Sequence, residues 1–220
     1  GFRQEGFGPA DMTVWKGSRY STAKAYLKPA LRKKNVQLLK RALVDQIIFE
    51  GKKAIGVKFI YQGETRIIKV KKDIVLSAGS INSPAILQRS GIGDGEELKS
   101  IGVSVLNHLP GVGKNLQDHL EVYFQVKCLQ PITLYKYLNP ISKLLIGMQW
   151  MFLKNGPGAS NQFETLGFIR SDRNIAYPDI QFHFLPVAIR YDGTAPSEGH
   201  GFQLHVGPMR SESRGNVKIK

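Results

Sequence analysis

Cysteine is almost absent from this sequence, and long apolar runs and acidic residues are also scarce. Each of these shortages excludes some classes of protein. Cys128 is the single cysteine among 220 residues, which excludes a disulfide within the chain and a zinc site built from several cysteines. The longest nearly apolar stretch, 144–153, is far shorter than the ~20 residues that cross a bilayer as a helix. An apolar content of 42% excludes a disordered chain, because enough apolar surface is present to offset the entropy of ordering.

Acidic residues are scarce as well, and the resulting net charge of +14 is unevenly placed. Residues 16–75 hold 16 Lys or Arg against 4 Asp or Glu, whereas residues 76–220 hold 14 against 11. A basic segment of this size attracts nucleic acid or an anionic membrane surface. We expect a solvated or membrane-facing surface and no nucleic-acid partner, because nucleic-acid-binding motifs are missing and the lysines alternate with apolar residues as in a half-exposed strand.

The periodicity of the sequence predicts two architectures that meet near residue 118. We expect an α/β plus α+β protein, with part of an α/β domain over 1–118 and part of an antiparallel-sheet domain over 119–220. Residues 1–20 are rich in glycine and predict loops. The expected helices are 23–31, 84–89, 96–101 and 141–153, and the expected strands are 36–39, 42–49, 54–61, 65–70, 73–77, 103–106, 119–128, 167–170, 180–185 and 202–206.

Residues 78–87 predict a sharp turn from a strand into a helix. Gly79 permits the turn, and Ser83 followed by Pro84 suits a helix cap and a first helical residue. Backbone N–H groups at such a helix start favour a phosphate or another anion. The usual G-x-G-x-x-G fingerprint is missing, and the glycines of 91–93 follow a helix, not a strand. The turn by itself therefore suits either a cofactor site or an ordinary α/β turn.

Other catalytic patterns are weak when the residues are considered alone. The nucleophile elbow G-x-S-x-G of hydrolases is absent. Glu164 stands among apolar residues, where its carboxylate suits either a ligand cation or the exposed side of a strand. No third ligand stands at a metal-binding spacing from any pair of histidines, so we expect no metal site. The five histidines are His108, His119, His183, His200 and His205.

Several long motifs resemble those of the glucose–methanol–choline (GMC) flavin oxidoreductases. They are SAGSINSPAILQRSGIG at 77–93, LPGVG at 109–113, NLQDH at 115–119, GFIRS at 167–171 and DIQFHFLP at 179–186. The segment GFQLHVGPMRS at 201–211 is similar to the choline-oxidising branch of that family in particular. The resemblance covers essentially the whole chain.

The resemblance implies an FAD-dependent enzyme that oxidises choline to betaine aldehyde by hydride transfer to the flavin, on the route to glycine betaine. The alternative within the family is an alcohol dehydrogenase that acts on a neutral alcohol, and a remote alternative is a non-catalytic basic binding module. The resemblance also implies a membrane electron acceptor and peripheral membrane association. The expected location is the cytoplasmic side of a bacterial inner membrane, or the mitochondrial inner membrane.

For the cofactor, the resemblance implies a site shared between two parts of the first domain. Val44 falls where the family lays a backbone group against the adenine, and Ala78, Gly79 and Ser80 fall where a strand turn packs near the adenosine part of FAD. The family's G-x-G-x-x-G has no counterpart here. Since the sequence also starts without Met, we expect an internal segment that retains no FAD and no activity in isolation.

For the substrate, the resemblance implies a cation site in the second domain. Glu164 aligns with the carboxylate that faces the trimethylammonium group in choline-oxidising members. Such a group donates no hydrogen bonds, so it requires a carboxylate and aromatic faces. Phe182 and Phe184 are the expected aromatic neighbours. No histidine matches the family's C-terminal base, so no catalytic residue is expected in this segment.

Overall fold

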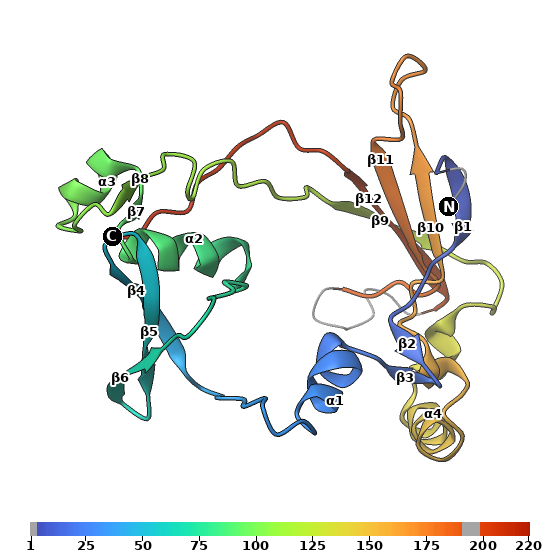
Figure 1. Ribbon diagram of the computed structural model, residues 1–220. Helices are drawn as coiled ribbons and strands as arrows, with labels where there is room; N and C mark the ends of the chain where they lie inside the picture. Colours follow the sequence, from blue (N-terminus) through green and yellow to red (C-terminus); the bar gives the residue numbers. More distant parts are fainter. Residues whose placement is uncertain (1–3, 191–198) are drawn as a thin grey trace. The chain divides into compact units, whose positions relative to one another are not determined.

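The computed structural model describes residues 4–190 and 199–220, and Figure 1 labels its helices and strands. The chain forms two compact units. Unit 1 consists of Gly1–Val36 and His119–Ser211, and unit 2 consists of Gln37–Asp118 and Glu212–Lys220. The break after residue 118 falls where the sequence predicts a boundary. The units differ from a simple division into 1–118 and 119–220, because each one takes a further segment from the opposite end of the chain.

Unit 1 is built on a five-stranded antiparallel sheet (Figure 1). The N-terminal segment belongs to this unit because β1 pairs with β10 along four residues. Four of the strands overlap ranges in which the sequence predicts a strand. In spatial order the strands are β1 (Gly6–Pro9), β10 (Thr165–Ile169), β11 (Ile180–Leu185), β12 (Gly201–Pro208) and β9 (Val122–Lys127).

The register of this sheet separates its side chains into two faces. Phe184 is the partner of Leu204, and His183 is the partner of His205. Because successive residues of a strand point to opposite faces, Phe182 and Phe184 share one face while His183 and His205 share the other. The first face is aromatic and aliphatic, and the second carries the polar groups.

Short elements surround the sheet of unit 1. The best defined is α4 (Pro140–Leu153), which begins as predicted: Asn139 caps it by accepting a hydrogen bond from the Ser142 N–H at 2.8 Å, and Pro140 is its first residue. The predicted first helix is present as a π-helical turn that continues into an α-helical one. The other elements are η1 (Ala23–Leu27), α1 (Lys28–Ala30), β2 (Val14–Trp15), β3 (Ser18–Arg19), η2 (Leu134–Tyr137) and η3 (Pro157–Ala159).

Unit 2 combines a three-stranded antiparallel sheet with short helices. Its strands are β4 (Leu43–Glu50), β5 (Lys53–Tyr61) and β6 (Glu64–Lys69), and α2 (Gly79–Arg89) packs against β4. The side chain of Ser90 ties the helix end to the sheet, because its Oγ accepts a hydrogen bond from the Ile47 N–H at 2.8 Å. The remaining elements are β7 (Ile92–Gly93), which pairs in parallel with β8 (Asn107–His108), and α3 (Gly95–Ser100).

Several contacts hold the C-terminal segment in unit 2. Leu116 and Gly215 form a two-way backbone bridge. The Gln88 side chain donates to the Val217 carbonyl at 2.7 Å and accepts from the Ile219 N–H at 3.0 Å. The Glu97 carboxylate forms ion pairs with Lys114 and Lys218, whose hydrogen bonds lower the pKa of Glu97.

The architecture is mixed α and β with several antiparallel sheets, as the sequence predicts, but several local predictions were wrong. Strands occur within 1–20, where loops were expected. Segments 36–39, 73–77 and 103–106 form no strand. No described strand pairs with residues 73–77, and Val75 is 85% exposed, so this apolar run lacks the ladder partners that a buried strand requires.

The start of α2 also differs from the start that the sequence predicts. The helix begins at Gly79 and not at Pro84, which lies inside it. Ser83 does not cap the helix from outside: its Oγ accepts a hydrogen bond from the Ala78 N–H at 2.9 Å. Because Pro84 has no N–H, the helical hydrogen bond to the Ser80 carbonyl, four residues earlier, is missing. The Ser80 carbonyl therefore lacks its usual partner within the helix.

Candidate functional site

The predicted cofactor residues Ala78, Gly79 and Ser80 form the exposed N-terminal end of α2. Gly79 has a φ of +85°, which only glycine adopts readily, and a Cβ at this position would have no atom within 4 Å. The first N–H groups of a helix lack partners within it, and the helix dipole favours negative charge at this end. The geometry fits the close approach of an anionic group to the backbone.

Val44 lies at the other end of the same helix. It is half-buried in β4, and Arg89, the last residue of α2, donates from Nη2 to the Val44 carbonyl at 3.4 Å and from Nε to the Asp45 carbonyl at 2.7 Å. The structure thus joins Val44 to the C-terminal end of α2, whereas Ala78–Ser80 form its N-terminal end. A helix of 11 residues rises about 16 Å, so these two predicted parts of the cofactor site do not form one compact cluster.

A hollow of about 310 Å³ lies beside Ser80 in unit 2. Lys114 contributes a cation to its wall, and Asn115 has a φ of +59°. Gly113 is required here, because a Cβ at this position would overlap the Val217 carbonyl and the Gln88 amide. Together with the start of α2, this hollow offers an extended anionic molecule backbone donors and open space, while the Lys114 ammonium group is paired with Glu97.

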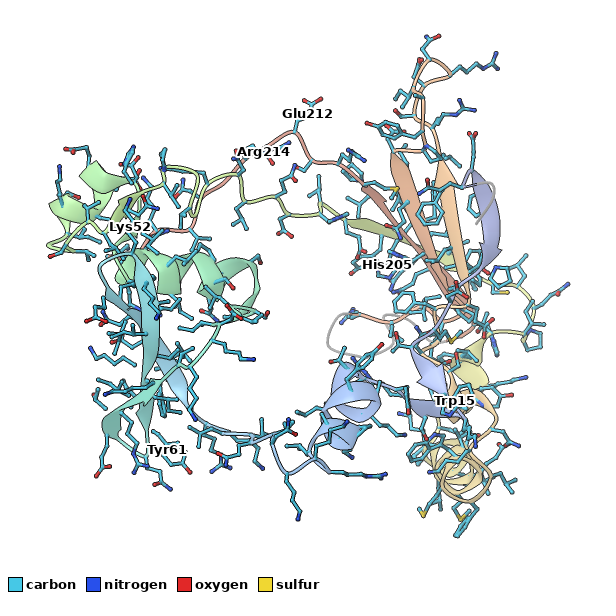
Figure 2. All side chains as sticks on the ribbon, in the orientation of Figure 1. Trp15, Lys52, Tyr61, His205, Glu212 and Arg214 are labelled. Atoms are coloured by element: carbon cyan, nitrogen blue, oxygen red, sulfur yellow. The ribbon has the colours of Figure 1, made fainter. Side chains whose placement is uncertain are left out.

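In unit 1, the polar face of the sheet carries a hydrogen-bonded cluster that the sequence analysis missed. His205, labelled in Figure 2, is 6% exposed. Its Nδ1 lies 2.7 Å from Glu121 Oε1, and its Nε2 lies 2.6 Å from the Gln203 side-chain nitrogen. His183 Nδ1 is 4.0 Å from the same Glu121 carboxylate. The register of β9, β11 and β12 is what brings these residues together, and the sequence alone does not reveal it.

Aromatic rings cover this cluster. Phe163 meets both imidazole rings edge to face, with centroids 6.0 Å from His183 and 5.8 Å from His205. Tyr123 stacks on His205 at 5.6 Å. Burial lowers the pKa of His183; the Glu121 carboxylate opposes this shift and His205 adds to it. The His183 imidazole is therefore less basic than a free one.

Glu164 immediately precedes β10 and follows Phe163 in the chain. Its carbonyl accepts a hydrogen bond from the Ala10 N–H at 3.0 Å, so its backbone is fixed to the strand next to β10. Its side chain is exposed, and among the described residues the carboxylate has no side-chain partner. The structure thus presents an exposed carboxylate one residue along the chain from an aromatic side chain, and a cation site requires both kinds of group.

The two predicted aromatic neighbours of Glu164 lie on the other face of the sheet from His183. Phe182 packs against Phe7, with ring centroids 5.6 Å apart, and Phe184 packs against Phe202 at the same distance. Phe163, the chain neighbour of Glu164, is the aromatic residue that the sequence analysis left out. Its proximity in the sequence was the only available signal.

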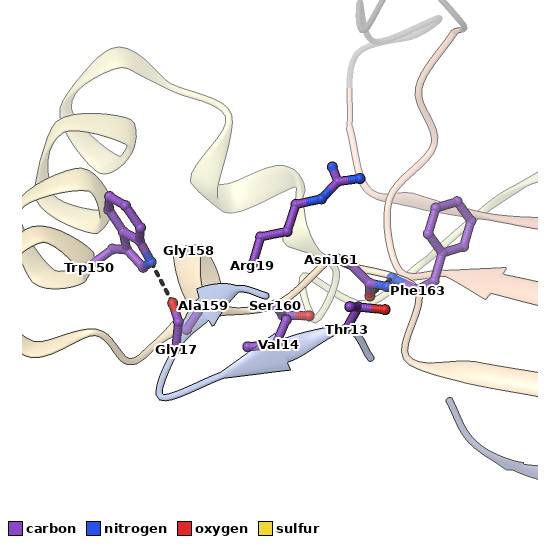
Figure 3. A pocket seen from close by; sticks show the side chains of 10 residues that line it. All are labelled: Thr13, Val14, Gly17, Arg19, Trp150, Gly158, Ala159, Ser160, Asn161 and Phe163. Atoms are coloured by element: carbon purple, nitrogen blue, oxygen red, sulfur yellow. Dashed lines mark hydrogen bonds between the residues drawn. The ribbon is translucent and has the colours of Figure 1, made fainter. Parts of the chain in front are cut away.

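Unit 1 has a hollow of its own, of about 520 Å³. It lies between the β2–β3 hairpin and the segment after α4 (Figure 3). Phe163 forms part of its wall, together with Arg19, Trp150 and Asn161. The Trp150 indole donates to the Gly17 carbonyl at 2.6 Å, which holds the hairpin against α4. The Arg19 guanidinium repels cations, so this hollow does not suit a quaternary ammonium group. Among the described residues no cluster of His, Cys, Asp and Glu suits a metal ion.

Comparisons with protein families and with individual proteins point to the same family. A model of the GMC oxidoreductase family matches residues 1–121. The chain is 54% identical over 220 residues to the oxygen-dependent choline dehydrogenase of Brucella anthropi, and 51% identical to that of Staphylococcus saprophyticus. Both alignments cover 100% of this chain but only 40% and 39% of the relatives. The chain therefore spans about two fifths of the length of the curated relatives it matches.

Solved structures show the same fold. Pyridoxine 4-oxidase from Mesorbium loti is 26% identical with a TM-score of 0.77, and the alignment covers 99% of this chain and 39% of that one. A formate oxidase variant from Aspergillus oryzae is 20% identical with a TM-score of 0.88, and the alignment covers 98% of this chain and 42% of that one. At these identities the likeness concerns the fold alone.

Proposed function

The chain belongs to the GMC oxidoreductase family, and we propose that it is an internal part of an FAD-dependent enzyme that oxidises choline to betaine aldehyde. The observation that carries the proposal is the identity of 51–54% to oxygen-dependent choline dehydrogenases along the whole chain. The alternative is another FAD-dependent alcohol dehydrogenase of the family, acting on a neutral alcohol. The two differ in whether the substrate site recognises a positive charge.

The residues of unit 2 fit the proposed cofactor. When bound, FAD supplies an acceptor for the two electrons and the hydrogen that leave the carbinol carbon. Ala78, Gly79 and Ser80 would hold an anionic part of it with backbone N–H groups, since the start of α2 is exposed and open. Val44 would contribute a backbone contact from β4. Lys114 lines the hollow beside Ser80, but its charge is balanced by the Glu97 carboxylate, so the backbone N–H groups would be the main donors to the anion.

Glu164 would recognise the substrate. Its carboxylate is free of ion pairs among the described residues, so its charge is available to a trimethylammonium group. Phe163, its neighbour in the chain, would supply one aromatic ring. Phe182 and Phe184 remain the predicted aromatic neighbours although they pack against Phe7 and Phe202. Cation–π contacts of this kind contribute roughly 0.5–2 kcal/mol each. Together they would hold the cationic end and so position the alcohol end for oxidation.

The test uses the full-length protein with Glu164→Gln, which keeps the shape of the side chain and removes its charge. We expect the KM for choline to rise at least about tenfold, since two opposite unit charges about 4 Å apart near a protein surface attract each other by up to about 4 kcal/mol, with the KM for a neutral alcohol unchanged. Asp172→Asn, in the β10–β11 connection of the same unit, is the matched control and leaves both values unchanged. Equal changes for the two substrates would favour the neutral-alcohol alternative.

The electron acceptor and the location form a separate part of the proposal. The sequence predicts a membrane acceptor, whereas the relatives' names describe oxygen-dependent enzymes. We propose that the protein is attached to the cytoplasmic surface of a membrane whichever acceptor it uses. Oxygen uptake by the full-length protein, measured against its reduction of a quinone, decides between the two acceptors.

A further inference from the structure

The hollow between the β2–β3 hairpin and the segment after α4 has the size and the lining of a small-molecule site. Its volume of about 520 Å³ lies within the range of known ligand pockets, about 300–1,000 Å³. Glycine, alanine, valine and aromatic residues form most of its walls, and a few polar side chains stand among them (Figure 3). The proposed oxidation of choline assigns no ligand to this hollow.

The charge of the hollow is positive and comes from Arg19. This residue lies in β3, and its side chain extends away from the hairpin (Figure 3). Among the described residues it is the one charged member of the lining, and no described carboxylate pairs with it. The lining residues all come from two stretches, 12–44 and 122–163, that contain neither Asp nor Glu. The neighbouring sequence therefore leaves the charge of Arg19 unbalanced.

Two uncharged side chains of the lining add hydrogen-bond donors. Asn161 uses its Oδ1 to accept a hydrogen bond from the Phe163 N–H at 3.1 Å, so its amide nitrogen remains available as a donor. The Thr13 hydroxyl lines the hollow as well, and it makes no hydrogen bond within the described part of the chain. The hollow thus combines one cation with two uncharged donors.

The two aromatic rings of the lining are held in place by contacts within unit 1. The Trp150 indole donates to the Gly17 carbonyl at 2.6 Å. Phe163 makes edge-to-face contacts with His183 and His205, at centroid distances of 6.0 Å and 5.8 Å. Both rings are half-buried. Because these apolar walls are already ordered, a ligand that enters the hollow does not bear the cost of ordering them.

This combination of groups favours a carboxylate over other anions. A guanidinium group binds the two oxygens of a carboxylate through two parallel N–H···O bonds. A phosphate group carries about −1.5 to −2 charges at pH 7, which a single arginine does not balance. The aromatic rings suit a carbon skeleton, which inorganic anions lack.

We propose that this hollow binds a small organic carboxylate. Arg19 pairs with the carboxylate, Asn161 and Thr13 donate further hydrogen bonds, and Phe163 and Trp150 contact the carbon skeleton. The inference goes beyond the proposed oxidation and does not rest on it, because choline is a cation and has no carboxylate.

The experiment is a calorimetric titration of the full-length flavoprotein with benzoate, which joins a carboxylate to one aromatic ring. Benzamide is the matched control ligand, because it has nearly the same shape and no charge. We expect benzamide to bind at least about tenfold more weakly, since it cannot form the charge-assisted pair with a guanidinium. The affinity for benzoate should also fall as salt is added, because Arg19 is exposed and its charge is screened.

Variants of Arg19 locate the binding. Arg19→Gln should weaken benzoate binding at least about tenfold, because it removes the positive charge. Arg19→Lys should give an intermediate affinity, since it keeps the charge but loses the planar fork. The matched control is Arg173→Gln in the β10–β11 connection, where the arginine is also exposed, and it should bind benzoate like the wild type. Thr13→Val should weaken binding by a smaller factor than Arg19→Gln, because it removes one uncharged donor.

Flavin absorbance and the thermal midpoint should be the same for all these variants, which shows that they fold. Four results would overturn the assignment: no binding of benzoate to the wild type, equal affinities for benzoate and benzamide, unchanged binding in Arg19→Gln, or equal affinities for benzoate and inorganic phosphate. Benzoate binding is measured without choline. A failure to oxidise choline would therefore count against the proposed activity alone.

Discussion

Glu121 and His205 are joined by a hydrogen bond of 2.7 Å between a carboxylate oxygen and Nδ1 of an almost fully buried imidazole. A carboxylate only accepts hydrogen bonds, so the proton lies on Nδ1 and leaves Nε2 to accept from the Gln203 amide at 2.6 Å. Gln203 in turn accepts from the Gln125 side chain and the Ile189 N–H. One carboxylate at the edge of β9 thus organises polar groups across three strands.

Removing that carboxylate should weaken unit 1. Glu121→Ala leaves the buried Nδ1–H of His205 without an acceptor, which costs about 1–3 kcal/mol of the free energy of unfolding. Glu121→Gln retains an acceptor oxygen and should cost less. Chemical denaturation of the full-length protein measures both, with Glu164→Gln as the exposed control, expected within about 0.5 kcal/mol of the wild type. Equal stability of Glu121→Ala and Glu164→Gln would show that the bond contributes nothing.

His183, which faces the same carboxylate, should make stability depend on pH. Burial lowers its pKa below the ordinary 6.5, with Glu121 opposing and His205 reinforcing the shift. The unfolded chain therefore binds a proton at a higher pH than the folded one, so the native state loses stability as pH falls below about 6.5. The loss levels off once the folded pKa is passed.

The measurement is the thermal midpoint of the full-length protein between pH 7.5 and pH 5, compared with that of His183→Gln. Glutamine does not titrate, so the variant should lose less stability over this interval. Gln181, whose amide is 3.0 Å from His183 Nε2, provides a control: Gln181→Ala removes a hydrogen bond but keeps the titrating group. Parallel curves for the wild type and His183→Gln would exclude His183 as the source.

Gly113 should be the least replaceable glycine of unit 2. Its φ is +79°, and a Cβ there would overlap the Val217 carbonyl and the Gln88 amide. Gly102 has nearly the same φ, +77°, with open space around it. Gly102→Ala therefore carries only the left-handed strain of roughly 1–2 kcal/mol, whereas Gly113→Ala adds a steric clash and should also release the C-terminal segment. Limited proteolysis near 212–220, together with denaturation, distinguishes the two variants.

Local signals account for the parts of the fold that the sequence predicted. The Asn139–Pro140 start of α4 and the alternation along β11 each depend on a few neighbouring residues, and both are present. The failures depend on partners distant in the chain. Residues 73–77 have the composition of a buried strand, but no described strand pairs with them. β1 forms by pairing with β10, whose residues lie 156 or more positions further along the chain.

The candidate site residues also divide into those that local sequence signals reveal and those that depend on partners distant in the chain. The turn at Gly79 and the carboxylate of Glu164 were singled out from their immediate neighbours, whereas only the family resemblance assigned them a role. The Glu121–His205 bond joins positions 84 residues apart, and only the sheet register places them together. The same register puts Phe182 and Phe184 on the face opposite His183, because a single step along a strand reverses the direction of a side chain.

Gly79 offers the sharpest test of the proposed cofactor site. Its φ of +85° resembles that of Gly102, and neither position has an atom within 4 Å of an added Cβ. Gly79→Ala and Gly102→Ala should therefore lower the stability of the protein by similar amounts. Only Gly79→Ala places a methyl group where the backbone would approach FAD, so only this variant should weaken FAD binding, by about tenfold or more, on the scale of a 1–3 kcal/mol overpacking penalty. Titration of the apoprotein with FAD, followed by flavin fluorescence, measures the difference, and equal affinities would remove the start of α2 from the cofactor site.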